Sequence, residues 1–283
     1  MSSLTQDVAR REMFIVDSNA PIGVFDSGIG GLTVVREIMR QIPNETIIYF
    51  GDTARVPYGN KSKETILKYS REITRFLINK GVKAIVIACN TASAFALEEI
   101  RKEINIPVVG VVKPGAIAAA AATRNEKVGV IGTQGTINSG IYKEFLSLTN
   151  PNIEVFSKAC PLFVPLVEEG MLDDPVTDEM IKRYISELTQ NDIDTLVMGC
   201  THYPLLQKAI RKYAGDNVTL VNPAYETARS LKEILLVTDL LKKAPTSCEH
   251  TFYVSDGADK FKEFANTILP CEVVEIILEV FNE

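Results

Sequence analysis

The sequence contains no tryptophan, only two histidines and no long apolar run. A helix that spans a membrane needs roughly 20 consecutive apolar residues, and the best candidate stretch, residues 106–122, is interrupted by Lys113 and Pro114. The first twenty residues hold one apolar run of four, whereas the core of a secretory signal takes roughly 7–15 residues. We therefore expect a cytoplasmic protein that neither enters a membrane nor carries an export signal.

An excess of basic residues is also absent. Lysine and arginine number 30 against 36 aspartates and glutamates, which gives a formal net charge of −6. Proteins that bind nucleic acid usually present a basic face, so no nucleic-acid partner is expected. With 283 residues, of which 46 % are apolar and 23 % charged, the chain has the composition of a folded globular protein of about two domains.

Cysteine is sparse and lacks paired spacing. No C-x-x-C motif occurs, which argues against a dithiol redox enzyme. An odd number of widely spaced cysteines without an export signal indicates free thiols in a reducing compartment. The five residues are Cys89, Cys160, Cys200, Cys248 and Cys271.

Short apolar runs alternate with helical patterns along the chain. Nearly continuous runs of this kind are typical of parallel strands whose two faces are covered by helices. Between the second and third runs, Ser62 is a suitable helix N-cap, and Gly81 is suited to end that helix in the left-handed conformation. The pattern predicts an α/β fold of βαβ units, with strands at residues 22–25, 47–50, 84–88 and 108–111.

The four runs recur in the same order, 106 to 111 residues further along the chain. The second set lies at residues 128–131, 153–156, 195–199 and 219–222. Two parallel-sheet α/β domains of one plan would produce this repetition. A duplication and the common layout of unrelated α/β domains are both consistent with it.

The tail after about residue 225 is too short for a third domain. It contains a helix-like stretch at 227–243, a strand-like one at 251–254 and a second helix-like one at 259–268. We expect the tail to pack on the first half. The expected domains are residues 1–112 with 223–283, in which 1–19 form an N-terminal extension, and residues 113–222.

The third run of each half leads directly into a cysteine, Cys89 in one half and Cys200 in the other. Ligands of open α/β sheets bind outside the carboxyl ends of the strands. A helix-like stretch follows each cysteine, and the dipole of a helix N-terminus lowers the pKa of a nearby thiol. We interpret both as reactive thiols at a substrate site. The alternative, a small buried apolar residue, is what we expect for Cys160, Cys248 and Cys271.

The first run of each half opens into a glycine-rich loop, at residues 25–34 and 131–137. Neither loop is a phosphate-binding motif, because a dinucleotide fingerprint that begins at Gly28 needs a glycine where Thr33 stands, and no Lys-Ser or Lys-Thr pair follows. The first loop instead offers Asp26 as a charged group for a site. His250 lies in a polar stretch and is expected at the surface.

Two thiols and one nearby histidine restrict the chemistry. Cys200 and His202 are too few for a structural zinc site, which takes about four ligands, although Cys89 could join them. A cysteine hydrolase would use a Cys–His pair and leave the second thiol unexplained. Two thiols facing one site can instead transfer protons on opposite faces of one carbon, one as thiolate and the other as thiol.

Six segments closely resemble glutamate racemase: PIGVFDSGIGGLTV, YFGDTARVPYG, VIACNTASA, VGVIGTQGTI, CPLFVPLVEEG and LVMGCTHYPLL. The resemblance runs from about residue 20 to the C-terminus, with all motifs in order. It implies two α/β domains with the active site between them. It also implies an enzyme that interconverts L- and D-glutamate with no cofactor and no metal, and that supplies D-glutamate for peptidoglycan.

The resemblance assigns roles to the residues that match its motifs. The implied catalytic residues are the acid–base thiols Cys89 and Cys200, assisted by Asp26, Glu168 and His202. Glu169 adjoins Glu168, so which of the two serves the site is left open. The implied substrate-binding residues are Asp26, Ser27, Pro57, Tyr58, Gly59, Asn90, Thr91, Thr133, Thr136, Thr201 and His202, with Thr133 and Thr136 at the carboxylate.

Two other functions are consistent with these features. Aspartate racemase is a related two-thiol enzyme that differs in the length of its substrate, and two α/β lobes around a cleft also occur in solute-binding proteins. The DSGIGG and CTHYPLL motifs favour glutamate. The sequence leaves the oligomeric state open, a homodimer included.

Overall fold

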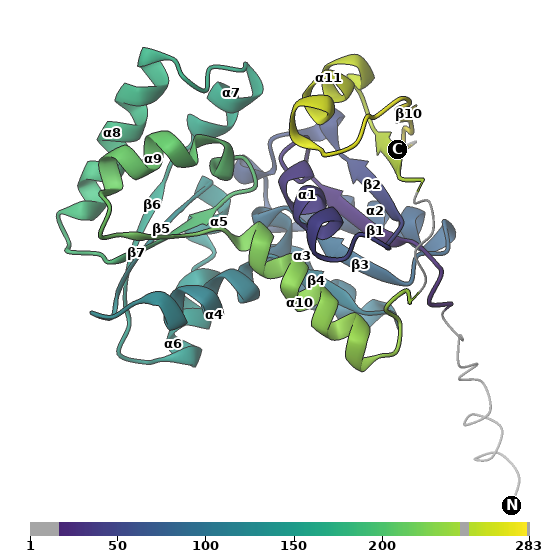
Figure 1. The fold of residues 1–283 in the computed structure, drawn as a ribbon, viewed down its shortest axis with the longest axis horizontal. Coiled ribbons are helices and arrows are strands. Elements are labelled where there is room, and N and C mark those ends of the chain that lie inside the picture. The colour runs from purple at the N-terminus through teal and green to yellow at the C-terminus, as the bar shows by residue number, and fades with distance from the viewer. Residues whose placement is uncertain (1–16, 244–248, 282–283) are drawn as a thin grey trace, which may run out of the picture.

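The computed structural model describes residues 17–243 and 249–281. Two parallel β-sheets lie side by side, each between layers of helices (Figure 1). The predicted α/β class is confirmed. Residues 1–16, most of the expected N-terminal extension, and Cys248 lie outside the described residues.

The first sheet has the strand order β10-β9-β2-β1-β3-β4, and all neighbouring strands are parallel. The tail returns to this sheet because β9 pairs with β2, which confirms that the tail packs on the first half. Strand β10 is only two residues long, too short for an apolar pattern to indicate it. The bounds are β1 Ile22–Asp26, β2 Ile47–Gly51, β3 Ala84–Ile87, β4 Val108–Gly110, β9 Thr251–Val254 and β10 Ile277–Leu278.

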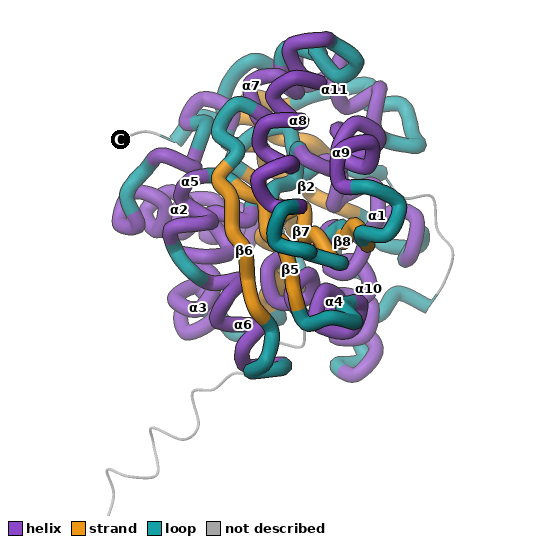
Figure 2. The backbone as a smooth tube through the Cα atoms, turned by 90° about the vertical axis from the view of Figure 1, so that its left-hand side faces the viewer, coloured by secondary structure: helices purple, strands orange, loops and turns teal. Residues whose placement is uncertain are grey.

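The second sheet has the order β6-β5-β7-β8, again with all neighbours parallel (Figure 2). This order repeats β2-β1-β3-β4 of the first sheet strand for strand, as the recurring runs predict. Strand β6 extends beyond its apolar run because Ser157, Lys158 and Ala159 continue the pairing with β5. The bounds are β5 Lys127–Gly132, β6 Glu154–Ala159, β7 Thr195–Gly199 and β8 Thr219–Val221.

Helix boundaries follow local capping chemistry. The side chain of Ser62 accepts a hydrogen bond from the Thr65 amide (3.3 Å), and Gly81 has a φ of +73° just after the helix, both as predicted. The helix predicted at 227–243 is misplaced and spans Pro223–Val237, because the Asn222 side chain caps its first turn and proline is favoured there.

The helices account for most of the remaining chain. The α-helices are α1 Leu32–Gln41, α2 Lys63–Asn79, α3 Asn90–Glu103, α4 Val112–Ala122, α5 Gln134–Asn138, α6 Ile141–Thr149, α7 Phe163–Glu168, α8 Pro175–Thr189, α9 Gln207–Ala214, α10 Pro223–Val237 and α11 Ala258–Ile268. Three short 3₁₀ helices are η1 Thr53–Arg55, η2 Tyr58–Asn60 and η3 Tyr203–Leu206.

Each sheet is packed on both faces. Helices α1, α10 and α11 cover one face of the first sheet, and α2 and α3 cover the other. Helices α7 to α9 cover one face of the second sheet, and α4 and α6 cover the other. Because α10 also contacts α4, it joins the two helical layers. We refer to the six-stranded sheet with its helices as the first half and to the four-stranded sheet with its helices as the second half.

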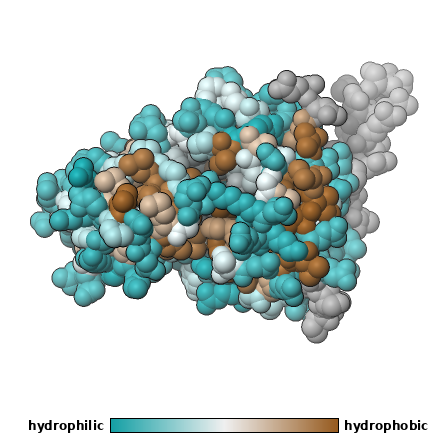
Figure 3. All heavy atoms as spheres, turned by 90° about the horizontal axis from the view of Figure 1, so that it is seen from above, coloured by the Kyte–Doolittle hydropathy of each residue, from teal (hydrophilic) through white to brown (hydrophobic). Residues whose placement is uncertain are grey.

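The face seen from above in Figure 3 is largely hydrophilic, with separate hydrophobic areas. Among the residues that the structure describes, no helix is long and apolar enough to cross a lipid bilayer.

Candidate active site

Polar residues from both halves meet at the carboxyl ends of the central strands. Asp26 ends β1 and Cys89 follows β3, while Thr133 follows β5 and Cys200 follows β7. The Thr201 hydroxyl, beside Cys200, donates to the Asp26 carboxylate across the two halves (3.3 Å). The repeated topology therefore brings the two strand-end cysteines toward one junction.

Cys89 is held in a buried, hydrogen-bonded position. Its sulfur accepts from the Ala92 amide at the start of α3 (3.5 Å), and its thiol donates to the Ser27 hydroxyl (3.6 Å). The side chain is only 6 % exposed. Burial and the nearby Asp26 charge raise the pKa of Cys89 to about 12, despite the two hydrogen bonds. The lowered pKa predicted from the helix dipole is thus wrong for Cys89, because burial outweighs the dipole.

Cys200 lies beside His202, which in turn contacts Glu168. Its sulfur is 3.8 Å from Nδ1 of His202, and Nε2 of His202 is 3.0 Å from a carboxylate oxygen of Glu168. Burial alone would lower the pKa of His202, but Cys200 and Glu168 raise it to about 10. His202 is therefore an imidazolium at neutral pH, and a positive charge at this position stabilises negative charge that forms on a neighbouring sulfur.

The structure distinguishes the two adjacent glutamates. Glu168 reaches His202, whereas Glu169 is exposed and forms an ion pair with Lys260 of α11 (3.0 Å). Of the two carboxylates, that of Glu168 is therefore the one in contact with His202.

Asp26 is fully buried at the junction. Its carboxylate accepts from the Gly28 amide (3.0 Å) and from the Thr201 hydroxyl (3.3 Å). Burial raises the pKa of Asp26, although the charge of His202 lowers it. The glycine loop permits this approach, since a Cβ on Gly30 would lie 2.4 Å from the Thr201 hydroxyl oxygen. The close neighbour of this loop is therefore the opposite half of the protein.

A cluster of three threonine hydroxyls also spans the two halves. Thr91 of α3 lies 2.9 Å from Thr133 and 3.2 Å from Thr136, and the last two are 3.0 Å apart. Gly59 packs against this cluster, because a Cβ there would lie 2.7 Å from Cβ of Thr133. Hydroxyl groups can donate to a carboxylate, so the cluster offers several donors at one point.

Tyr58 is buried beside the loop that carries Asp52. Its hydroxyl donates to the carboxylate of Asp52, and its ring packs on Tyr69. The preceding Pro57 follows a cis peptide bond and lines a cavity together with Gly59. The Tyr58 hydroxyl therefore supports the loop at residues 57–59.

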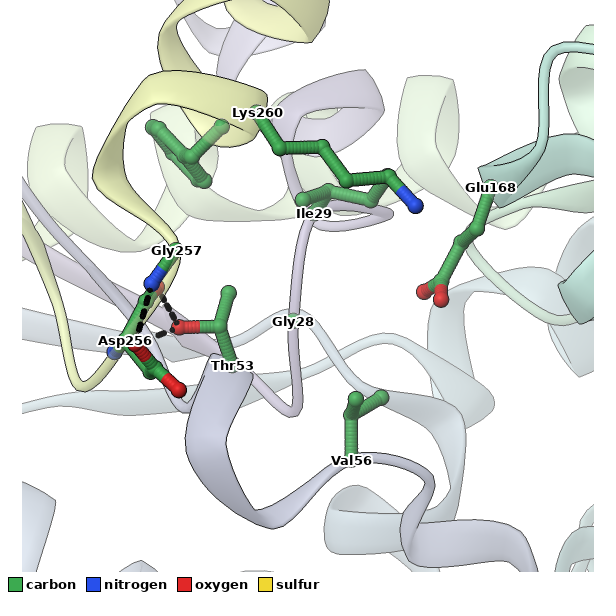
Figure 4. A pocket seen from close by; sticks show the side chains of 9 residues that line it. Gly28, Ile29, Thr53, Val56, Glu168, Asp256, Gly257 and Lys260 are labelled. Carbon is green, nitrogen blue, oxygen red and sulfur yellow. Dashed lines mark hydrogen bonds between the residues drawn. The ribbon is translucent and has the colours of Figure 1, made fainter.

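Two cavities lie at the junction, and Val56 and Glu168 line both. In the first, of about 200 Å³, Glu168 and Lys260 extend from opposite sides (Figure 4). The second measures about 270 Å³ and is lined by Val56, Pro57, Gly59, Asn60, Thr133, Gln134, Pro161, Val164, Pro165 and Glu168. Neither cavity is lined by Cys89 or Cys200.

Two contacts across the halves have no signal in the sequence. The Thr33 hydroxyl donates to the backbone carbonyl of Thr201 (3.0 Å), and the Tyr142 hydroxyl donates to the side-chain oxygen of Asn90 (2.7 Å). Each depends on how two distant segments are placed, which only the sheet topology could indicate.

Among the described residues, Cys160, Cys271 and His250 make none of these hydrogen bonds. Cys160 is buried as expected, whereas Cys271 is exposed. His250, expected at the surface, is partly exposed, and its Nδ1 accepts a hydrogen bond from the Ile47 amide (3.2 Å). In the described part of the chain, no group of three or more His, Cys, Asp or Glu residues could hold a metal ion.

Comparison with known proteins identifies the family of this chain. The family described as Asp/Glu/hydantoin racemase matches residues 22–231. The glutamate racemase of Geobacter metallireducens is 52 % identical over 265 residues, which cover 93 % of this chain and 98 % of that protein.

Solved structures agree in fold and sequence. A glutamate racemase isoform from Bacillus anthracis has a TM-score of 0.89 and 40 % identity, covering 94 % of this chain and 98 % of that one. The glutamate racemase from Francisella tularensis, solved in complex with D-glutamate, has a TM-score of 0.85 and 42 % identity over the same shares. The chain therefore belongs to the Asp/Glu/hydantoin racemase family and, within it, to the glutamate racemases.

Proposed function

We propose that this protein interconverts L- and D-glutamate by two-base proton transfer at Cα, with Cys89 and Cys200 serving opposite faces of the substrate. The observation that carries the proposal is the placement of two buried thiols at equivalent strand ends of opposed halves. One sulfur, as thiolate, removes the α-proton, and the other, as thiol, delivers a proton to the opposite face. The product has the inverted configuration, and the protonation states of the sulfurs have exchanged.

The surroundings of the two sulfurs suit these alternating roles. Cys89 has a raised pKa and donates to Ser27, as a resting acid would. Cys200 lies beside the His202 imidazolium, which stabilises negative charge on sulfur. The carboxylates of Glu168 and Asp26 interact with His202 and compensate its positive charge.

The α-proton of glutamate is far less acidic than a thiol, so the enzyme must stabilise the negative charge that develops on removing it. We propose that Thr133 and Thr136 hold a substrate carboxylate, with Asn90, Thr91 and Thr201 as further donors. A buried junction strengthens these interactions by excluding water. Both cysteines are only 6 % exposed, so we infer that contacts between the halves, such as Thr91–Thr133 and Thr201–Asp26, open to admit substrate.

The biological setting follows from the same proposal. We infer that the enzyme supplies D-glutamate for peptidoglycan and works in the cytoplasm, where the free thiols of its described cysteines stay reduced. Residues 1–112 with 223–283 and residues 113–222 are the proposed domains, and the two would separate to admit substrate.

Cofactor independence is the direct test. After exhaustive dialysis against a chelator and a carbonyl reagent, the purified protein should still racemise L-glutamate, as measured by circular dichroism, because both proton carriers are side chains of the chain itself. Activity that is lost and then restored by pyridoxal phosphate or a divalent metal would contradict the two-thiol mechanism. Turnover of aspartate in place of glutamate would support aspartate racemase, and binding without turnover would support a solute-binding protein.

Replacing Glu168 should change the pH dependence. Glu168→Gln removes one of the groups that raise the pKa of His202, so the imidazolium should lose its proton at a lower pH. The alkaline limb of the kcat/KM profile should move down by about 1–3 pH units, the usual effect of a neighbouring opposite charge. Glu169→Gln is the matched control and should leave the profile in place. An equal displacement in both variants would argue against a specific effect of Glu168 on His202.

A further inference from the structure

Tyr142 links the second half to the residue that follows Cys89. Its hydroxyl donates to the side-chain oxygen of Asn90 over 2.7 Å, and both side chains are only 3 % exposed. Asn90 begins α3 in the first half, whereas Tyr142 lies on α6 in the second. A buried hydrogen bond between two separate packing units therefore ends directly beside one thiol.

The ring of Tyr142 packs against the residue that precedes the other cysteine, Cys200. Gly199 ends β7 immediately before Cys200, and a Cβ at Gly199 would lie 3.0 Å from the ring of Tyr142. Gly115 of α4 is also close, since a Cβ there would lie 3.5 Å from the hydroxyl. Burial and the charge of Cys200 both raise the pKa of Tyr142, so the hydroxyl keeps the proton that it donates.

The hydrogen bond fixes the orientation of the Asn90 amide. The tyrosine hydroxyl occupies the oxygen of that amide, so the NH₂ group is directed elsewhere. Within the described residues, Asn90 has no other side-chain hydrogen bond. Its NH₂ group is thus held as a donor with no partner supplied by the described chain.

We propose that Tyr142 is a positioning residue: by binding the Asn90 oxygen from the opposite half, it aims the Asn90 NH₂ group at the substrate. This inference rests on the proposed racemase function, in which Asn90 donates to the substrate. Because the contact crosses the halves, the amide is correctly aimed only when the halves have closed. Tyr142 acts through Asn90 and does not touch the reacting atoms.

A double-mutant cycle tests the proposal. Tyr142→Phe removes the hydroxyl and keeps the ring, and should lower kcat/KM for glutamate by about tenfold, the effect of losing one buried hydrogen bond. In an Asn90→Ala background, the same substitution should change kcat/KM by less than about twofold, because the group through which Tyr142 acts is gone. An equal loss in both backgrounds would show that Tyr142 only packs, and would overturn the proposal.

Matched measurements separate this proposal from the proposed function. Tyr213→Phe removes a hydroxyl that donates to Asp178 between α8 and α9, and should leave kcat/KM unchanged. If the wild-type protein fails to racemise glutamate, the proposed function fails, yet the side-chain amide resonances of Asn90 in ¹⁵N NMR still report the contact. Tyr142→Phe should shift these resonances while Tyr213→Phe leaves them in place. Resonances that do not move in Tyr142→Phe would refute the positioning role.

Discussion

Replacing Cys89 or Cys200 with alanine is expected to lower kcat for glutamate racemisation by on the order of 10³-fold or more, with the fold retained. General acid–base catalysis typically contributes 10²–10⁴-fold, and each face of Cα depends on its own sulfur. When one of the two thiols is removed, one of the two proton transfers has no carrier, so racemisation in both directions should fail. Polarimetric or circular-dichroism assays measure the loss, and thermal unfolding shows whether each variant remains folded.

The other cysteines provide the controls. Alanine at Cys160, Cys248 or Cys271 should leave kcat near the wild-type value. Cys160 is buried, so its replacement should cost some stability through a small cavity, whereas Cys271 is exposed and should cost little. Similar losses of activity at all five positions would mean that the cysteines are structural and that the two-thiol mechanism is wrong.

The sheets could be predicted from the sequence because their strands are buried on both faces. Burial on both faces makes nearly continuous apolar runs, and these runs place β1, β2, β3 and β5 within two residues of their true bounds. Elements that lack this signal were missed or misplaced. Strand β10 has two residues, and the start of α10 depends on the cap at Asn222.

The candidate site also has features that the sequence predicts and features that it does not. Strand-end position and topology bring Cys89 and Cys200 to one junction, because equivalent strands of a repeated fold end at equivalent points. The protonation of Cys89 could not be predicted, since its raised pKa depends on burial and on the charge of Asp26, which the sequence does not place in space. Thr33 and Tyr142 were missed because their partners lie on the opposite half.

The glycine-rich loop shows how one sequence signal can have two structural meanings. Glycines permit a close approach of the backbone to another group, which in dinucleotide-binding α/β folds is a pyrophosphate. Here the neighbour of Gly30 is the segment Thr201–His202 of the second half. The close approach lets Asp26 meet Thr201, so the loop contributes to the junction between the two halves.

Racemisation in deuterium oxide is expected to place deuterium at Cα of nearly every product molecule. If each sulfur serves one face, the proton delivered comes from the sulfur opposite the one that removed the substrate's hydrogen. That second sulfur has exchanged with solvent before the reaction. Starting from L-glutamate, the D-glutamate formed early should therefore carry deuterium, while the remaining L-glutamate stays mostly protiated.

A single base working on both faces gives a different isotope pattern, because it would return part of the original hydrogen to the product. Mass spectrometry of the separated enantiomers at low conversion measures the fraction of product that keeps the substrate hydrogen. The two sulfurs follow β3 and β7, strands of separate sheets, so each belongs to a different half of the protein. Substantial transfer of the substrate's own α-hydrogen into product would refute two-base catalysis, even if both cysteines proved essential.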